Sequence, residues 1–263
     1  MKIGVYSNPN KDVNNTVRNA VLDAAAAIGI TAELFAVDEK YDFIVSVGGD
    51  GTILRIAKHS ALSDTPILGI NMGTVGFLTE VEPSEIERAL KKLVSRDYML
   101  ERRALIDAAV GDSRYHALND VVVRSTCGRM IAMEVRVDDE LIDRFTCDGY
   151  IACTPTGSTA YSLSAGGAVI GPNTPVIALT PINPHTLRTR PIVVGSFEKV
   201  TMTNTGTTQA ALFVDGEKAV ELDGGDSVSV TGCDRSACFV RFSKKSFYSR
   251  LLNKLNYWSA SED

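Results

Sequence analysis

The sequence predicts a fold of two parts: an α/β domain with a parallel sheet over residues 1–100, and a β-rich domain over residues 101–245. Two observations support this prediction. Short apolar runs alternate with helical patterns in the first part, which is typical of a parallel sheet covered by helices. In the second part, runs of alternating or β-branched residues follow one another with turn residues between them. The remaining residues, 246–263, are expected to form a C-terminal helix that packs back on the first domain.

Four apolar runs in the first part are typical of short buried strands, and they lie at residues 2–6, 31–36, 41–47 and 66–71. Helical spacing of apolar residues marks residues 12–28 and 83–96, and the second of these segments opens with Pro-Ser-Glu. Ligands of such folds bind at the C-terminal edge of the strands. We therefore expect a functional site where the strand at 41–47 ends.

The second part is predicted to be mostly antiparallel strands. Their expected positions are residues 104–110, 120–124, 132–137, 176–179, 200–204, 210–214 and 227–231. Turn signals such as Asp215-Gly216 and Gly224-Gly225 separate them. The C-terminal segment 246–255 has helical spacing of its apolar residues.

Composition restricts the class of protein. The 263 residues are 44% hydrophobic and 22% charged, as expected for a soluble globular enzyme. A net charge of −5 argues against a nucleic-acid partner, which would need a basic face. The sequence shows neither a signal peptide nor a membrane-spanning run, so we expect no membrane partner and a cytoplasmic location. The five cysteines include no C-x-x-C pair, which argues against a structural zinc site and predicts reduced thiols.

The most informative motif follows the strand expected at 41–47, and it reads Gly48-Gly49-Asp50-Gly51-Thr52. A strand that ends in glycines and feeds a helix builds an anion site, because the backbone N–H groups and the helix dipole favour negative charge. A carboxylate beside phosphates is repulsive unless a metal ion neutralises it or it accepts a proton from an attacking hydroxyl. The motif therefore favours phosphoryl transfer. The alternative from these residues alone is a glycine turn with a capping Asp.

A second polar segment lies in the β-rich part, at residues 154–167, and is dense in Ser and Thr. Short hydroxyls suit sugar hydroxyls and the edge of a purine, and Tyr161 offers a flat face on which a base can stack. From composition alone, a Ser/Thr-rich turn that caps a short helix at Ser158 is an equal alternative.

Taken together, these motifs resemble the NAD kinase family, whose members phosphorylate NAD to NADP. The resemblance rests on residues 48–52, 71–79, 119–120, 154–161 with 164–167, 181–187 with 190–191, and 247–252, in the family's order. The first motif is shared with lipid kinases and distantly with phosphofructokinases, whereas 154–161 is close to diagnostic. The resemblance implies a Rossmann-like first domain and the two-domain architecture shared by NAD kinases and diacylglycerol kinases.

The resemblance assigns roles in the glycine-rich loop. Asp50 matches the family's general base, which acts on the 2′-hydroxyl of the adenosine ribose of NAD. The loop of Gly48, Gly49, Gly51 and Thr52 would approach the phosphates through its backbone. Arg55 matches a basic position that neutralises phosphate charge. Phe77 would form an apolar wall of the pocket or belong to the core.

Further positions would bind the nucleotide. Asn119 and Asp120 resemble the family's Asn-Glu pair, which contacts the adenine and the ribose hydroxyls, although Asp120 is one methylene shorter than the usual Glu. Asp148 matches a nucleotide-binding acid, and Thr146 is a more variable contact. Glu217 stands where the family usually has Gln, so it keeps an acceptor and adds negative charge. The positions expected to line the NAD pocket in the hydroxyl-rich segment are Thr156, Thr159, Ala160, Tyr161, Ser162, Leu163 and Ser164.

The implied reaction is one in-line transfer of the γ-phosphoryl group to the 2′-oxygen, with ATP or polyphosphate as the donor. A divalent metal ion, Mg²⁺ or Mn²⁺, would bridge the donor phosphates, and no protein ligand to it is assigned. Family members are homodimers or homotetramers, so the expected partners are NAD, ATP and further copies of the chain. Two alternatives stay open: a lipid kinase of the diacylglycerol or sphingosine type, and a non-catalytic NAD(P) sensor. A protein that only binds the nucleotide would gain nothing from a carboxylate directed at a phosphate, so Asp50 argues against the sensor.

Overall fold

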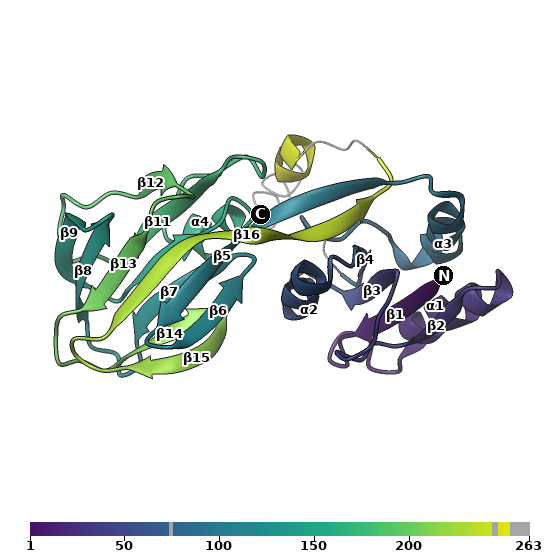
Figure 1. Ribbon diagram of the computed structural model, residues 1–263, viewed down its shortest axis with the longest axis horizontal. Coiled ribbons are helices and arrows are strands. Elements are labelled where there is room, and N and C mark those ends of the chain that lie inside the picture. The colour runs from purple at the N-terminus through teal and green to yellow at the C-terminus, as the bar shows by residue number, and fades with distance from the viewer. Residues whose placement is uncertain (74–75, 244–246, 253–263) are drawn as a thin grey trace, which may run out of the picture. The chain divides into compact units, whose positions relative to one another are not determined.

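The computed structural model describes residues 1–73, 76–243 and 247–252. The chain divides into two compact units. We call them the α/β unit, which holds residues 1–102 and the described residues from 236 onward, and the β unit, which holds Arg103–Arg235. The predicted fold class is confirmed, because the first unit has a parallel sheet with helices and the second is almost entirely antiparallel strands (Figure 1).

The α/β unit follows the predicted alternation. Its elements are β1 (Lys2–Ser7), α1 (Thr16–Ala27), β2 (Thr31–Leu34), β3 (Phe43–Gly48), α2 (Asp50–Ser63), β4 (Ile67–Asn71), the 3₁₀ turn η1 (Pro83–Glu85) and α3 (Ile86–Ser95). The sheet order is β2-β1-β3-β4, with the end of β16 (Ser227–Arg241) beside β4, and all these pairs are parallel. Residues 247–252 are helical, and the rest of the expected C-terminal helix at 246–263 lies outside the described residues.

Helices cover both faces of this sheet (Figure 1). Val21 of α1 and Leu90 of α3 pack in one buried cluster with Val45 of β3. On the other face, Ile53 of α2 packs against Gly69 of β4. Strand β3 is buried along its whole length, as is typical of a strand in a parallel sheet covered by helices. It ends at Gly48, and helix α2 begins two residues later.

Helix α1 begins later than predicted, at Thr16 instead of Asp12. The carboxylate of Asp12 accepts hydrogen bonds from the backbone N–H groups of Val17 and Arg18, at 3.1 and 2.9 Å. Asp12 thus caps the first turn from outside the helix, which satisfies amides that have no partner within it.

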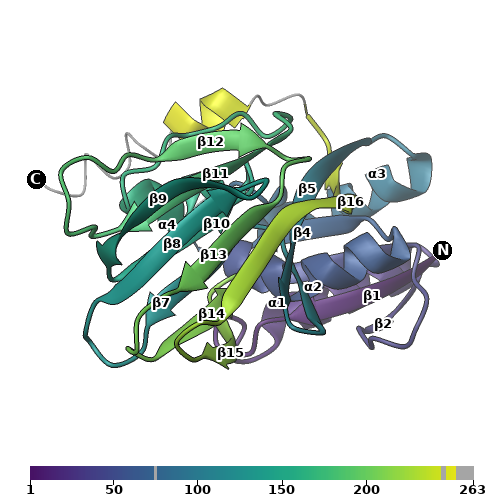
Figure 2. The ribbon, with the colours of Figure 1, turned by 60° about the vertical axis from the view of Figure 1, so that its left-hand side comes forward.

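The β unit consists of antiparallel strands. Its elements are β5 (Met99–Val110), β6 (Ser113–Ala117), β7 (Asp120–Ser125), β8 (Ile131–Val137), β9 (Glu140–Cys147), β10 (Gly149–Cys153), the 3₁₀ turn η2 (Gly157–Thr159), α4 (Tyr161–Ser164), β11 (Val176–Ile182), β12 (Ile192–Gly195), β13 (Val200–Asn204), β14 (Ala210–Val214), β15 (Glu217–Leu222) and β16, the first and last strands passing into the α/β unit. One sheet has the order β12-β11-β10-β7-β14-β15 (Figure 2). The other places β13 between β16 and β8, with β9 beside β8.

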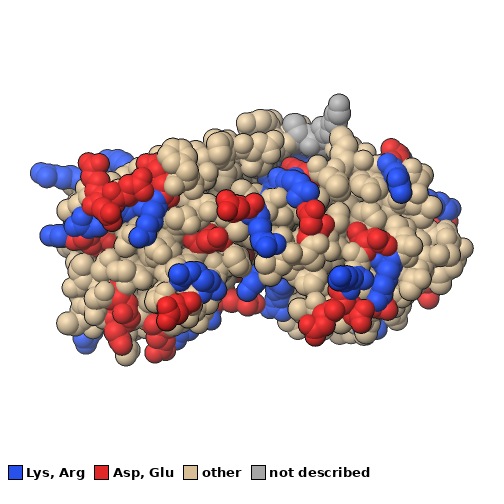
Figure 3. Space-filling view, viewed as in Figure 1, with Lys and Arg blue, Asp and Glu red and all other residues tan. Residues whose placement is uncertain are grey.

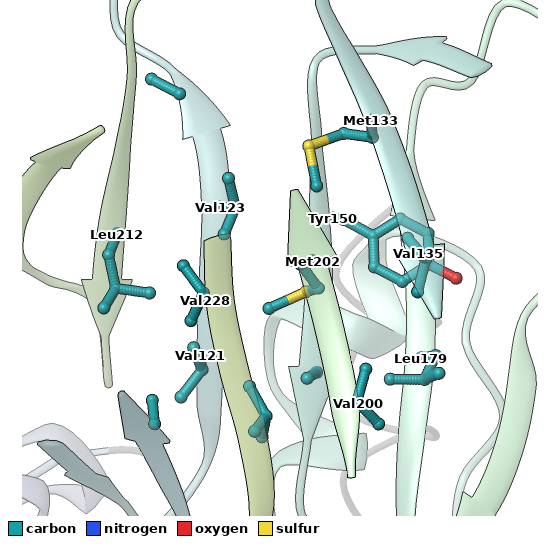
Figure 4. Close-up of a cluster of buried hydrophobic side chains, with 14 of the residues drawn as sticks. Val121, Val123, Met133, Val135, Tyr150, Leu179, Val200, Met202, Leu212 and Val228 are labelled. Carbon is teal, nitrogen blue, oxygen red and sulfur yellow. The ribbon is translucent and has the colours of Figure 1, made fainter. Parts of the chain in front are cut away.

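The core of the β unit lies between these two sheets. Met133 of β8 and Met202 of β13 meet Val121 of β7, Tyr150 of β10 and Leu179 of β11 (Figure 4). All five side chains are fully buried. At roughly 1.5–3 kcal/mol for each large buried apolar side chain, this layer is a main source of the unit's stability. It holds the ends of β7 and β10 in place, and the polar loops of the site follow from those ends.

Charged side chains of both signs lie on the surface. On the face drawn in Figure 3, acidic and basic side chains are interspersed over both units. Within the described part of the chain, no helix has the length and apolar character that crossing a membrane requires.

Candidate active site

The glycine-rich loop joins β3 to α2 at the carboxyl edge of the parallel sheet. Gly49 is the N-cap of α2 in extended conformation, and Asp50 is the first helical residue. The N–H groups of Thr52 and Ile53 bond to the carbonyl of Gly49, which closes the first turn. The start of the helix is therefore well formed, and its dipole favours an anion beyond Gly49.

The Asp50 carboxylate is held by the backbone of a second loop. Its two oxygens accept hydrogen bonds from the N–H groups of Phe77 and Leu78, at 2.8 and 3.0 Å. A Cβ atom on Gly76 would lie 2.0 Å from Oδ1 of Asp50, so only glycine leaves room for this carboxylate. The acid is thus fixed in orientation by backbone donors, while each oxygen keeps a further acceptor site.

A buried arginine supports that second loop from behind. Arg241, at the end of β16, donates from Nη1 to the carbonyl of Leu78 at 2.8 Å and from Nε to Glu101 at 2.5 Å. Glu80 lies 3.4 Å from the same guanidinium, which is 4% exposed. Arg241 therefore binds a carbonyl group of the same loop whose N–H groups bind Asp50, and it holds that loop in place.

Two basic side chains come from segments next to the glycine-rich loop in the fold. Arg55 is exposed one turn beyond Gly51 on α2. Lys11 comes from the loop after β1, and its Nζ would lie 2.7 Å from a Cβ atom placed on Gly49. The preceding Asn8 donates from Nδ2 to the hydroxyl of Thr52 at 3.2 Å. The loop after β1 thus brings a positive charge to the glycine-rich loop, which sequence analysis did not single out.

Thr52 and Phe77 lie in the interior. Thr52 is 1% exposed, with its hydroxyl bonded to Asn8. Phe77 is 7% exposed, and its ring packs on that of Phe247, with the centroids 5.8 Å apart. Phe77 therefore belongs largely to the core, and its expected contact with NAD stays a prediction.

In the β unit, the expected nucleotide-binding pair lies at the junction of β6 and β7. Asn119 is half-buried and Asp120 is 5% exposed. Thr154 fixes this junction, since its N–H donates to the carbonyl of Asn119 at 2.9 Å and its hydroxyl to that of Leu118 at 2.5 Å. A Cβ on Gly157 would lie 2.0 Å from the carbonyl oxygen of Asn119. Glycine is therefore required for the hydroxyl-rich segment to reach the Asn119-Asp120 junction.

The same junction is held by Asp215, in the turn between β14 and β15. Its carboxylate accepts N–H hydrogen bonds from Leu118, Asn119 and Asp120, at 2.9, 2.7 and 3.1 Å. Burial raises the pKa of Asp215, and these three donors oppose the rise. Burial and the nearby Asp215 carboxylate raise the pKa of Asp120 from 3.8 to about 7. The site thus contains a buried carboxyl that titrates near neutral pH.

Some hydroxyl groups of the hydroxyl-rich segment form hydrogen bonds within the protein, and other residues of the segment are exposed to solvent. Ser162 is fully buried, and its hydroxyl lies 2.8 Å from that of Thr180. Ser158, also fully buried, donates to the carbonyl of Pro155 at 2.6 Å. Thr156 is 6% exposed, and its carbonyl accepts a hydrogen bond from the hydroxyl of Thr159.

The outward side of this segment is formed by other expected residues. Tyr161 begins α4 and is 38% exposed, so part of this aromatic side chain is accessible from solvent. Ser164 is exposed, and Ala160 and Leu163 are half-buried. Of the hydroxyl-rich residues, Tyr161 and Ser164 are therefore the most accessible to a nucleotide.

Two expected residues, Thr146 and Asp148, lie apart from this junction, whereas a third, Glu217, follows two residues after Asp215 in the turn that binds it. Thr146 is exposed at the end of β9, and its carbonyl accepts a hydrogen bond from the N–H of His185. Asp148 is exposed between β9 and β10 and accepts a hydrogen bond from Nδ2 of Asn183 at 2.9 Å. Glu217 is exposed at the start of β15.

The structure therefore joins Asn119, Asp120 and the start of the hydroxyl-rich segment directly. Four supporting residues were not predicted as site residues: Lys11, Gly76, Asp215 and Arg241. Asp215 could have been found from its Asp-Gly turn. Arg241 carries no sequence signal, because its partners lie more than 130 positions away.

Comparison with known proteins decides the family. A model of the ATP-NAD kinase N-terminal domain matches residues 8–98, and a model of the ATP-NAD kinase C-terminal domain matches residues 118–242. The chain belongs to the NAD kinase family. It is therefore an enzyme of the kinase class, and the glycine-rich loop, Asp50, the Asn119-Asp120 junction and the hydroxyl-rich segment all lie within the two matched ranges.

Curated members of the NAD kinase family align with nearly the whole chain. The NAD kinase of Moorella thermoacetica is 40% identical over 247 residues, which are 91% of this chain and 79% of the relative. That of Caldanaerobacter subterraneus subsp. tengcongensis is 36% identical over 278 residues, with coverage of 97% and 98%.

Solved structures show the same fold. An NAD kinase from Archaeoglobus fulgidus in complex with ATP superposes with a TM-score of 0.82 at 33% identity, covering 97% of this chain and 99% of that one. Yeast NADH kinase complexed with NADH superposes with a TM-score of 0.86 at 24% identity, covering 97% of this chain and 87% of that one, and supports the fold alone.

Proposed function

We propose that this chain phosphorylates the 2′-hydroxyl of the adenosine ribose of NAD to give NADP, with Asp50 as the general base. One observation carries the assignment of the base. Asp50 begins the helix after the glycine-rich loop, and its two oxygens are oriented by the N–H groups of Phe77 and Leu78. A ribose hydroxyl is a poor nucleophile at neutral pH, and a fixed carboxylate that accepts its proton lowers the barrier.

The proposed sequence of events is one in-line displacement. The 2′-hydroxyl donates a hydrogen bond to a remaining acceptor site of Asp50, and its proton moves to that oxygen as the 2′-oxygen attacks the γ-phosphorus of ATP. The bond between the γ-phosphorus and the β,γ-bridging oxygen breaks on the opposite side, and ADP leaves with that oxygen. The backbone of Gly48, Gly49 and Gly51 would lie against the phosphates, because glycine permits close approach. Lys11 and Arg55 would offset the phosphate charge.

The β unit would bind the adenosine part of NAD. Asn119 would contact the adenine through its amide, and the carboxylate of Asp120 would accept hydrogen bonds from ribose hydroxyls. Tyr161 would stack on a ring of the substrate. The remaining positions proposed to contact NAD are Phe77, Thr146, Asp148, Thr156, Thr159, Ala160, Ser162, Leu163, Ser164 and Glu217.

We propose ATP as the phosphoryl donor, and polyphosphate as a second donor. The ATP bound to the Archaeoglobus NAD kinase supports the first choice.

The residues of the glycine-rich loop fit a divalent cation held mainly by donor phosphates, because each oxygen of Asp50 keeps an acceptor site and is the kind of ligand that Mg²⁺ prefers. When bound, Mg²⁺ or Mn²⁺ would offset the charge of the transferring phosphoryl group.

We further propose a homodimer or homotetramer. Exposed apolar side chains near β12 support this, since Val193, Phe197 and Leu187 are 50%, 88% and 92% exposed. Large exposed apolar groups are typical of contact surfaces. Size-exclusion chromatography with light scattering measures the molar mass of the assembly and so the number of chains in it.

The activity is tested by NADP formation. The purified full chain is incubated with NAD, Mg²⁺ and either ATP or polyphosphate, and NADP is read with an NADP-specific dehydrogenase. Turnover with either donor supports the proposal and identifies the donor. NAD binding without turnover would instead favour the nucleotide sensor, and a lack of both would contradict the proposed substrate.

A further inference from the structure

Three side chains of different chemistry meet in the β unit, away from the residues of the proposed reaction. Asp107 lies on β5, His116 on β6 and Cys233 on β16. One potential ligand atom from each lies within 4.8 Å of the other two. Within residues 1–73, 76–243 and 247–252, no second group of three such side chains satisfies this spacing.

Strand pairing explains why two of these residues meet. Asp107 and His116 are direct partners in the antiparallel pair of β5 and β6. Side chains in such pairs point to the same face of the sheet and are near neighbours. Oδ1 of Asp107 and Nδ1 of His116 are 2.6 Å apart, and Sγ of Cys233 lies 4.0 Å from the same nitrogen. The three atoms therefore converge on one point.

A thiolate, an imidazole and a carboxylate are the ligand types of protein-bound zinc. Zinc bonds of about 2.0–2.3 Å in a tetrahedron separate neighbouring ligand atoms by roughly 3.2–3.8 Å. The observed separations of 2.6 and 4.0 Å bracket this range. Binding would open the Asp107–His116 hydrogen bond by less than about 1 Å and draw Cys233 inward. Only side-chain adjustments are needed.

Two features bear on cation binding by this cluster. The backbone N–H of Arg235 donates to Sγ of Cys233 at 3.4 Å, whereas burial and the neighbouring Asp107 raise the pKa of the thiol to about 11, so Zn²⁺ would have to displace its proton. The side chains of His116 and Asp107 are 25% and 36% exposed, so water can reach the group and fill a fourth position. A thiolate and a carboxylate together neutralise a divalent ion.

We propose that Asp107, His116 and Cys233 bind one Zn²⁺ ion, with water as the fourth ligand. The absence of C-x-x-C pairs in the sequence does not oppose this site, because its ligands come from three separate strands. The ion would tie the β5–β6 hairpin to β16. His116 stands three residues before Asn119, so the ion would also restrain the strand that leads to the Asn119-Asp120 junction.

The test is zinc binding by the untagged full chain after removal of metal with a chelator. Zn²⁺ is titrated against a chromophoric competitor for the wild type, Cys233→Ser and Cys127→Ser. Cys127 is an exposed thiol outside the cluster and is the matched control. We expect one equivalent bound with a Kd on the order of 1 µM or tighter in the wild type and in Cys127→Ser. Cys233→Ser should bind at least about 100-fold more weakly.

A second measurement does not depend on any variant. Co²⁺ bound by the wild type should give a thiolate-to-cobalt charge-transfer band and intense tetrahedral d–d bands. Zn²⁺ should also raise the Tm of the wild type and leave that of Cys233→Ser unchanged. The proposal is overturned if the wild type binds no stoichiometric Zn²⁺, if Co²⁺ shows no thiolate band, or if Cys127→Ser instead of Cys233→Ser loses binding.

Discussion

Replacing Asp50 by Asn affects both the proposed proton transfer and the hydrogen bonds that hold this side chain, and the two effects can be measured separately. In the wild type, both carboxylate oxygens accept a backbone N–H, from Phe77 and from Leu78. An Asn side chain has one oxygen, so its NH₂ group would face the other backbone donor. The substitution therefore removes the proton acceptor and also breaks one of two hydrogen bonds.

The two effects have different magnitudes and different readouts. Loss of a general base lowers kcat by roughly 10²–10⁴. An unsatisfied N–H group among buried residues costs about 1–3 kcal/mol of unfolding free energy. Phe77 and Leu78 are 7% and 2% exposed, so water compensates little. NAD affinity should change by less than about tenfold, because the proton is transferred only in the reaction.

Kinetics with an NADP-specific dehydrogenase measure the first effect, and denaturant unfolding measures the second. Gly76→Ala is the companion variant, because it keeps the carboxylate and displaces it with a Cβ that would lie 2.0 Å from Oδ1. It should lower kcat by about 10²-fold or more. Asp23→Asn, on the exposed side of α1, is the matched control and should retain wild-type turnover. Near-wild-type turnover in Asp50→Asn would refute the role of Asp50 as the base.

Three further predictions test the supporting residues. Arg241→Met leaves the carboxylates of Glu80 and Glu101 without their buried partner, and should lower the unfolding free energy by about 3–5 kcal/mol in denaturant titrations. Gly157→Ala places a Cβ 2.0 Å from the carbonyl oxygen of Asn119, and should lower the unfolding free energy by about 1–3 kcal/mol. It should also weaken NAD binding measured by calorimetry, and an unchanged affinity would contradict the proposed contact of this junction with NAD. The raised pKa of Asp120 means that folding favours its protonated form, so the stability it contributes is complete below about pH 4 and is lost as the pH rises through about 7. The stability of the wild type relative to Asp120→Asn should therefore fall by about 2–3 kcal/mol between about pH 5 and about pH 8, and parallel stability curves would show that Asp120 does not titrate in this range.

Local pattern was sufficient for much of the fold. The alternation in the first hundred residues appears in the structure as β1 to α3, because each buried strand and each amphipathic helix carries its own periodicity. The strands that pattern missed are β6, β9, β10, β12 and β15. In β9 and β15, charged residues on an exposed face interrupt the apolar alternation, and these strands form through their partners β8 and β14.

The long strand β16 shows a second limit of local pattern. Its predicted end was near residue 231, whereas the strand continues to Arg241. Asp234, Arg235 and Ser236 are polar and interrupt the apolar pattern after that point. Beyond them, Phe239 pairs with Ile67 of β4, and the buried residues Ala237–Val240 continue the strand into the α/β unit. Pairing with a strand about 170 positions earlier cannot be read from a local window.

The fold class, the glycine-rich loop with Asp50 and the hydroxyl-rich segment with Tyr161 can be predicted from the amino-acid sequence, because their chemistry and periodicity lie in short local runs. How these groups are held follows from contacts that form only in the folded chain. Phe77 and Leu78 orient Asp50, Arg241 braces their loop, Asp215 binds the Asn119-Asp120 junction, and Asp107 meets His116 and Cys233. These contacts join residues distant in the chain, and they depend on strand register and on the direction of buried side chains, which only the packed core fixes.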